Sequence, residues 1–127
     1  MERYPDLEIY ALDIAFKDVE DWLKENFKTV ERTEVIGKKS KARIHFLADG
    51  DEVVVFSSAV GKYASIWFKQ NNSPWLTDLE CARSACQALD TQIRCSNSGW
   101  EEGQGPQSQW WRITKSEDEM LIEWPEG

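Results

Sequence analysis

Residues 41–70 read KARIHFLADGDEVVVFSSAVGKYASIWFKQ and predict three consecutive strands. KARIHFL alternates between apolar and polar side chains, as a strand with one buried face does. ADGD predicts a tight hairpin turn, because Gly50 tolerates a positive φ. EVVVFSS is apolar on both faces, which predicts a central strand covered on both sides. KYASIWFKQ alternates again and places Tyr63 and Trp67 on the face opposite Phe68.

A helix is predicted on each side of this stretch. Residues 13–30 carry one apolar stripe at steps of three and four residues, with Asp13 as the N-cap. The second helix opens within NNSPWLTDLE. Pro74 suits a first helical turn, whereas Thr77 and Glu80 match a capping box. The sequence therefore allows two starts for this helix, a few residues apart.

Four further strands complete the prediction. LEIYAL precedes the first helix, TQIRC follows the second, and WWRIT with MLIEW forms a terminal hairpin. The resulting order is β-α-β-β-β-α-β-β-β. Seven strands and two helices predict a single α+β domain over residues 1–127, with a mainly antiparallel, curved sheet and both helices on one face.

The composition is that of an acidic globular protein. The 127 residues include 15 basic and 23 acidic side chains, for a formal net charge of −8. Because such a surface repels phosphate backbones and anionic lipids on average, we expect neither nucleic acid nor membrane as a partner. No apolar run is long enough to span a membrane, and MERYPDLEIY does not resemble a signal peptide. With three cysteines, an odd number for a disulfide framework, these features predict a cytoplasmic protein.

The cysteines and the histidine do not form a recognisable chemical motif. Cys86 and Cys95 fall on predicted inner faces, whereas Cys81 falls on the far side of its helix, where we expect exposure. Three cysteines and one histidine lack the ligand spacings of a zinc site. A catalytic cysteine would need a base, and His45 is the only histidine. We therefore expect no metal and no cofactor, and we favour binding over catalysis.

Two adjacent tryptophans occur in WWRIT, residues 110–114. Neighbouring side chains on a strand point to opposite faces, so one of the two rings must leave the main core. Trp111 is in phase with Ile113 and is expected to point inward. Trp110 is in phase with Arg112 and is expected to point outward.

Tyr63 and Trp67 share the predicted outward face with Trp110 if these strands belong to one sheet. Exposed aromatic patches usually mark binding surfaces, and Trp and Tyr dominate binding hot spots. Two alternatives stay open. A coiled sheet could wrap these rings into a second small core, or Trp110 could pack locally on Arg112 as a cation–π pair.

A polar loop over residues 97–109 holds Trp100, Glu101 and Glu102, which could grip a basic partner. Our main hypothesis is a non-enzymatic bacterial protein-binding module that engages either itself, as a homodimer, or a basic protein. The anchors would be side chains of the aromatic sheet face, with the loop residues at its rim. The predicted binding residues are Trp110, Trp67, Tyr63, Arg112, Trp100, Glu101 and Glu102.

Three other functions remain as alternatives. An acidic inhibitor or immunity-type protein would use its charge to steer onto a basic enzyme. The order of elements in a small acidic chain is also similar to that of bacterial secretion-chaperone-like domains. Lastly, a small enzyme or ligand carrier would have a pocket between the second helix and the 97–109 loop, lined by Trp75, Cys81 and Trp100.

Overall fold

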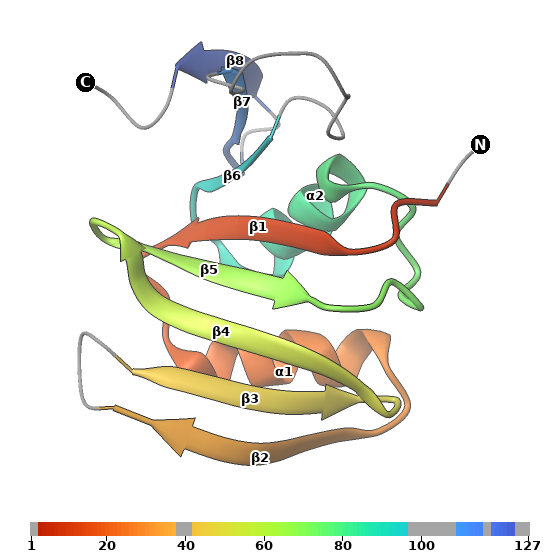
Figure 1. Cartoon of the computed structure of the whole chain (residues 1–127). Helices are drawn as coiled ribbons and strands as arrows, with labels where there is room; N and C mark the ends of the chain where they lie inside the picture. Colours follow the sequence, from red (N-terminus) through yellow and green to blue (C-terminus); the bar gives the residue numbers. More distant parts are fainter. Residues whose placement is uncertain (1–2, 38–41, 97–108, 116–117, 124–127) are drawn as a thin grey trace, which may run out of the picture.

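The computed structural model describes residues 3–37, 42–96, 109–115 and 118–123, which form ten helices and strands (Figure 1). In chain order these are β1 (Leu7–Leu12), α1 (Phe16–Asn26), β2 (Val30–Ile36), β3 (Arg43–Ala48), β4 (Asp51–Val60), β5 (Tyr63–Phe68), α2 (Asp78–Leu89), β6 (Ile93–Ser96), β7 (Gln109–Ile113) and β8 (Glu119–Glu123).

The strands form one sheet in the order β2-β3-β4-β5-β1-β6-β7-β8, and each neighbouring pair is antiparallel. Both helices cover the same face of this sheet (Figure 1). The α+β class and the antiparallel sheet predicted from the sequence are therefore confirmed. Among the described residues, neither helix is both long enough and apolar enough to cross a membrane.

Residues 41–70 form the three predicted strands, but β4 is not covered on both sides as predicted: the helices cover one face, and Phe56 on the other is 42% exposed. Buried and less buried residues alternate along β3 and β5, and Trp67 lies on the face opposite Phe68. Asp49 and Gly50 have φ values of 51° and 87° in the turn between β3 and β4. Two central residues with positive φ are typical of the hairpin turn whose twist matches that of the strands.

The end of the first helix differs from the prediction. α1 stops at Asn26, and Val30, the last residue of the predicted helix, instead begins the edge strand β2. β2 has no buried apolar face, because all its residues after Val30 are exposed. On its inner side Arg32 bonds to Glu20 of α1 at 2.7 Å, and its guanidinium lies over the ring of Phe46. A polar strand of this kind lacks the alternation by which strands are recognised.

The predicted N-cap is wrong for the first helix and right for the second. Asp13 is not the cap of α1: it turns the chain out of β1 with a φ of 50°, and Ala15 occupies the cap position without a side-chain bond. In α2 the Thr77 hydroxyl accepts a hydrogen bond from the backbone N–H of Glu80, so the second of the two predicted starts is right.

The core lies between the helices and the inner face of the sheet. Cys86 and Cys95 are buried there as predicted, but Cys81 is buried too, with none of its surface exposed. α2 buries a wide arc that includes Ala82 and Ala85, because it packs against β1, β6 and α1 at once. The expectation of an exposed Cys81 was therefore wrong.

Candidate functional site

The face of the sheet opposite the helices, here the open face, carries every described residue of the predicted binding surface. Trp67 is 37% exposed on this face, and Tyr63 and Arg112 are half-buried. Trp110 is also half-buried, and its ring meets that of Tyr10 edge-on at 5.5 Å between centroids. Trp111 packs against the core, so the opposite orientations predicted for the two tryptophans are observed.

The other predicted binding residues, Trp100, Glu101 and Glu102, lie outside the described residues. The structure thus brings together four of the seven predicted residues: Trp110, Trp67, Tyr63 and Arg112. Their role in binding stays a prediction.

One row of side chains crosses the open face over all eight strands. Cross-strand partners of an antiparallel sheet lie on the same face, and their pairing connects one residue of each strand to the next. We call this set the arginine row. From β2 to β8 it consists of Ile36, Arg43, Phe56, Ser65, Tyr10, Arg94, Arg112 and Met120.

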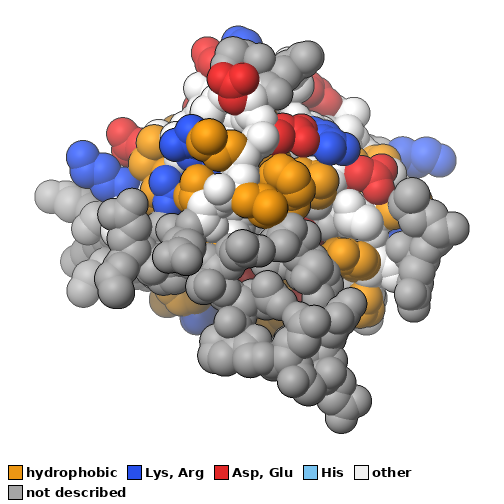
Figure 2. All heavy atoms as spheres, turned by 90° about the horizontal axis from the view of Figure 1, so that it is seen from above, with side chains coloured by type: hydrophobic (Ala, Val, Ile, Leu, Met, Phe, Trp, Pro, Cys, Tyr) orange, Lys and Arg blue, Asp and Glu red, His pale blue; other side chains and the backbone are white. Residues whose placement is uncertain are grey.

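The arginine row has a charge opposite to that of the chain. It contains three arginines and no carboxylate, so its formal charge is +3. Removing this +3 from the total of −8 leaves −11 on all other residues. Figure 2 shows the side of β7 and β8, where hydrophobic side chains lie at the surface beside both basic and acidic side chains.

Two arginines of the row lie over aromatic rings, and the third contacts a methionine sulfur. The guanidinium of Arg43 lies 5.4 Å from the ring centroid of Phe56, and that of Arg94 lies 4.6 Å from the ring centroid of Tyr63. Arg112 places Nη2 2.9 Å from the sulfur of Met120. Arg94 also donates from Nε to Oε1 of Gln92 at 3.0 Å. For Arg43, a position over the ring leaves the edge of the guanidinium available to a planar anion.

Two of these guanidiniums have a buried donor without a partner. Within the described residues, neither Nε of Arg43 nor Nε of Arg112 has a hydrogen-bond partner, and neither side chain pairs with a carboxylate. A buried donor left unpaired costs about 1–3 kcal/mol. An acceptor from a bound molecule would recover this energy, and a carboxylate is the best match for the geometry.

A pocket of about 290 Å³ lies on the open face over β3, β4 and β5. It forms where small and large side chains alternate diagonally: Val54 pairs with Trp67, and Phe56 pairs with Ser65. The two large rings rise beside the two short side chains and enclose a hollow. We call it the Trp67 pocket, and its lining residues are Glu8, Arg43, His45, Val54, Phe56, Ser65, Trp67 and Lys69.

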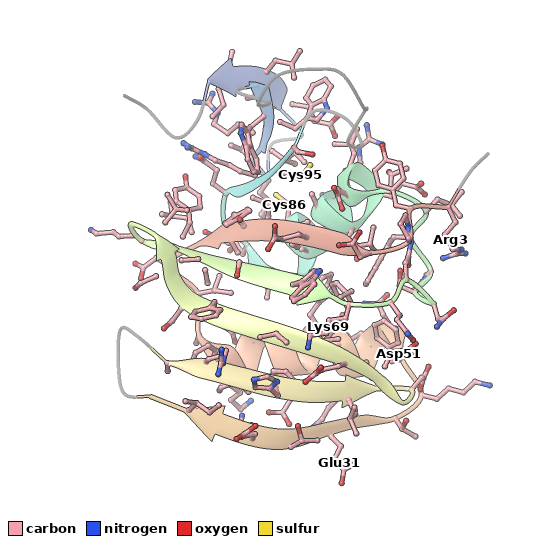
Figure 3. All side chains as sticks on the ribbon, viewed as in Figure 1. Arg3, Glu31, Asp51, Lys69, Cys86 and Cys95 are labelled. Atoms are coloured by element: carbon pink, nitrogen blue, oxygen red, sulfur yellow. The ribbon has the colours of Figure 1, made fainter. Side chains whose placement is uncertain are left out.

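A series of polar contacts orients the side chains along one side of the Trp67 pocket. Lys69, whose side chain lies beside the end of β5 in Figure 3, places Nζ 2.6 Å from Oε1 of Glu52. Oε2 of Glu52 lies 2.8 Å from Nδ1 of His45. The hydrogen bonds from Lys69 and then from His45 lower the pKa of Glu52. Because a carboxylate only accepts, Nδ1 carries the proton, and the buried Nε2 of His45 has no partner within the described residues.

Two contacts hold the indole of Trp67. Nε1 donates to Oδ2 of Asp6 at 3.0 Å, and Nζ of Lys69 lies 5.4 Å from the ring centroid. These contacts fix the orientation of an exposed ring, which lowers the entropy lost when a ligand packs on it.

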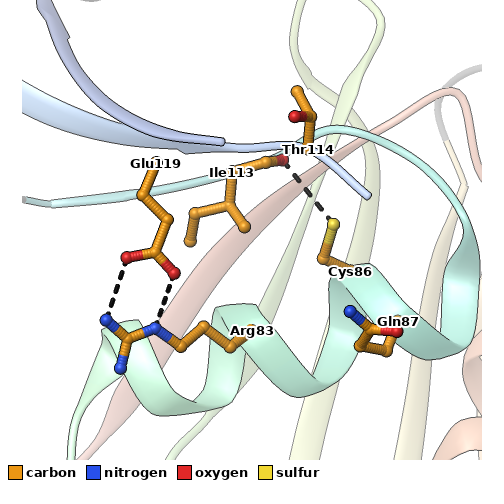
Figure 4. A pocket seen from close by; sticks show the side chains of 6 residues that line it. All are labelled: Arg83, Cys86, Gln87, Ile113, Thr114 and Glu119. Carbon is orange, nitrogen blue, oxygen red and sulfur yellow. Dashed lines mark hydrogen bonds and ion pairs between the residues drawn. The ribbon is translucent and has the colours of Figure 1, made fainter. Parts of the chain in front are cut away.

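A second pocket, of about 280 Å³, lies between α2 and the β7–β8 hairpin (Figure 4). Its charged groups satisfy each other, because Arg83 donates to both carboxylate oxygens of Glu119 at 2.7 and 2.9 Å. The thiol of Cys86 is directed at the carbonyl of Ile113, and burial raises the pKa of this thiol. The charged groups of this pocket are thus paired with each other, and its thiol is buried.

Two of the three residues expected from the sequence to line a pocket, Trp75 and Cys81, do not lie at a surface. Trp75 and Cys81 belong to the core, with 7% and 0% of their surface exposed, and burial raises the pKa of Cys81 well above its usual value. Trp100 lies outside the described residues.

Comparison with protein-family models, with curated proteins and with solved structures gives no match to this chain. In the part of the chain that the structure describes, no group of three or more His, Cys, Asp or Glu side chains is placed to hold a metal ion. The function is therefore argued from the open face alone.

Proposed function

We propose that this chain is a non-enzymatic protein-binding domain whose open face binds an acidic, extended segment of a partner protein. The observation that carries this proposal is the arginine row, in which Nε of Arg43 and Nε of Arg112 have no partner among the described residues.

The dimensions of the row suit an extended segment. Neighbouring strands lie about 4.8 Å apart, so a row over eight strands is about 34 Å long, which matches about ten extended residues. Alternate residues of such a segment face the sheet. Carboxylates at those positions would meet the arginines, while the residues between them point away.

The distribution of charge favours a short acidic segment over other polyanions. The charge of −11 outside the row repels a long phosphate backbone, whereas a segment confined to the row meets three guanidinium groups and no carboxylate of the row. The total charge alone suggested a basic partner, but the arginine row itself has the opposite formal charge, +3. A basic partner, a nucleic acid and a second copy of the chain are therefore the competing outcomes of the test.

Arg112→Gln should weaken binding of a fluorescein-labelled peptide of alternating glutamate and threonine, about ten residues long, by at least about fivefold. The matched control is Arg83→Gln, which removes the same charge from α2, where Arg83 is already paired with Glu119. We expect this control to bind like the wild type. Fluorescence anisotropy measures both affinities, and binding should weaken as salt is added.

The same assay with a lysine–threonine peptide and with oligothymidylate of similar length tests the competing partners. Tighter binding of either probe than of the acidic peptide would contradict the proposal, as would equal binding by wild type and Arg112→Gln. Size-exclusion chromatography with light scattering tests whether the open face binds a second copy of the chain. A wild-type dimer that Arg112→Gln makes monomeric would assign the open face to that second copy.

A further inference from the structure

The Trp67 pocket on the open face is flanked by two aromatic rings, Phe56 and Trp67. In the described part of the chain, Phe56 and Trp67 are the two exposed aromatic residues, 42% and 37% exposed, and both line this pocket. Exposed aromatic side chains that flank a hollow are typical binding hot spots, because a ligand ring buries them at little entropic cost. The hollow of about 290 Å³ is near the lower limit for ligand pockets and holds a single ring-sized group.

A donor for a carboxylate lies at the edge of the same pocket. Arg43 lines it, is stacked on Phe56, and has a buried Nε without a partner in the described residues. On an extended segment, the next side chain that faces the sheet is two residues away, at about 7 Å. A carboxylate at that spacing from a ring in the pocket can reach Arg43.

Resting on the function proposed above, we infer that the Trp67 pocket receives one aromatic side chain of the acidic segment, and that a carboxylate two residues away binds Arg43. The pocket thereby selects a pattern of aromatic and acidic residues with one residue between them. Phe56 and Trp67 contact the ring, whereas Arg112, farther along the row, contacts another carboxylate.

Two matched peptides test this inference. Both derive from the glutamate–threonine peptide, and the central glutamate becomes phenylalanine in one and alanine in the other, so their charges are equal. We expect the phenylalanine peptide to bind the wild type at least about fivefold more tightly than the alanine peptide. Trp67→Ala should abolish this preference and leave the dependence on Arg112 intact.

Ser65→Leu provides a second variant that fills the hollow without removing either ring, in case Trp67→Ala loosens the fold. It should likewise abolish the preference for phenylalanine, with thermal unfolding monitored for both variants. Free 3-phenylpropionate tests whether the pocket instead binds a small aromatic acid. We expect it to displace the phenylalanine peptide only at concentrations far above the peptide's Kd. Displacement at or below that Kd would overturn the assignment to a peptide segment.

The two proposals fail in different ways. If both peptides bind equally and still require Arg112, the pocket inference is wrong and the binding face stands. If neither peptide binds, the proposed function fails and the inference fails with it.

Discussion

Trp22→Ala should lower the free energy of unfolding by about 3–5 kcal/mol, because it empties the largest buried site of the core. Trp22 is 1% exposed on α1. Its indole stacks on Trp75 at 5.1 Å and meets Phe68 edge-on at 6.0 Å between ring centroids. Its Nε1 also donates to the hydroxyl of Ser84 at 3.1 Å, so one side chain joins α1 to β5 and α2.

Urea unfolding followed by circular dichroism measures this loss. Trp67→Ala is the matched control, because it removes the same side chain from the open face, where the indole is 37% exposed. We expect the control to lose less than half as much stability as Trp22→Ala. Equal losses in the two variants would show that the cluster around Trp22 does not dominate the core.

The alternating pattern of residues 41–70 was sufficient to predict the faces of β3 and β5. Each strand buries one set of alternate residues, and a one-residue shift would expose the whole set. The same reasoning fails for β2, because an edge strand needs no apolar face and here uses Arg32 on its inner side. It also fails for Cys81, since the width of the arc that α2 buries depends on how many neighbours pack around it.

The candidate site required the order of the strands as well as their faces. Alternation alone places Arg43 and Trp67 outward, and it does the same for Trp110 and Arg112. The structure inserts β1 between β5 and β6, so that Tyr10 pairs with Ser65 on one side and Arg94 on the other. Strands that follow each other in sequence are usually neighbours in the sheet, and no local pattern indicates this insertion. The arginine row could therefore not be predicted from the sequence.

Asp78→Asn should stabilise the protein by about 1–2 kcal/mol near pH 7.5. Burial is the main reason that the pKa of Asp78 rises from 3.8 to about 6, and the charges of Asp6 and Glu8 raise it further. The backbone N–H of Glu8 donates to Oδ1 of Asp78 at 3.1 Å, which opposes the rise. Asparagine keeps this acceptor oxygen and has no charge to desolvate. The gain is smaller than the pKa shift implies, because Asp78 also lies in the first turn of α2, where a negative charge is favourable.

Because the pKa of Asp78 is raised in the folded state, the stability of the wild type depends on pH. The folded protein holds the Asp78 proton more tightly than the unfolded chain does, so the wild type loses stability as pH rises from 3.8 to about 6. Above that range the loss is complete, and the advantage of Asp78→Asn is largest. Near pH 4 Asp78 is mostly neutral in the folded wild type, as asparagine is in the variant. The free energies of unfolding of the two proteins should then differ by less than about 1 kcal/mol. Asp18→Asn, in the first turn of α1 and exposed, is the matched control and should give no gain at either pH. A gain for Asp78→Asn of the same size at both pH values would contradict the assignment of the effect to the buried charge of Asp78.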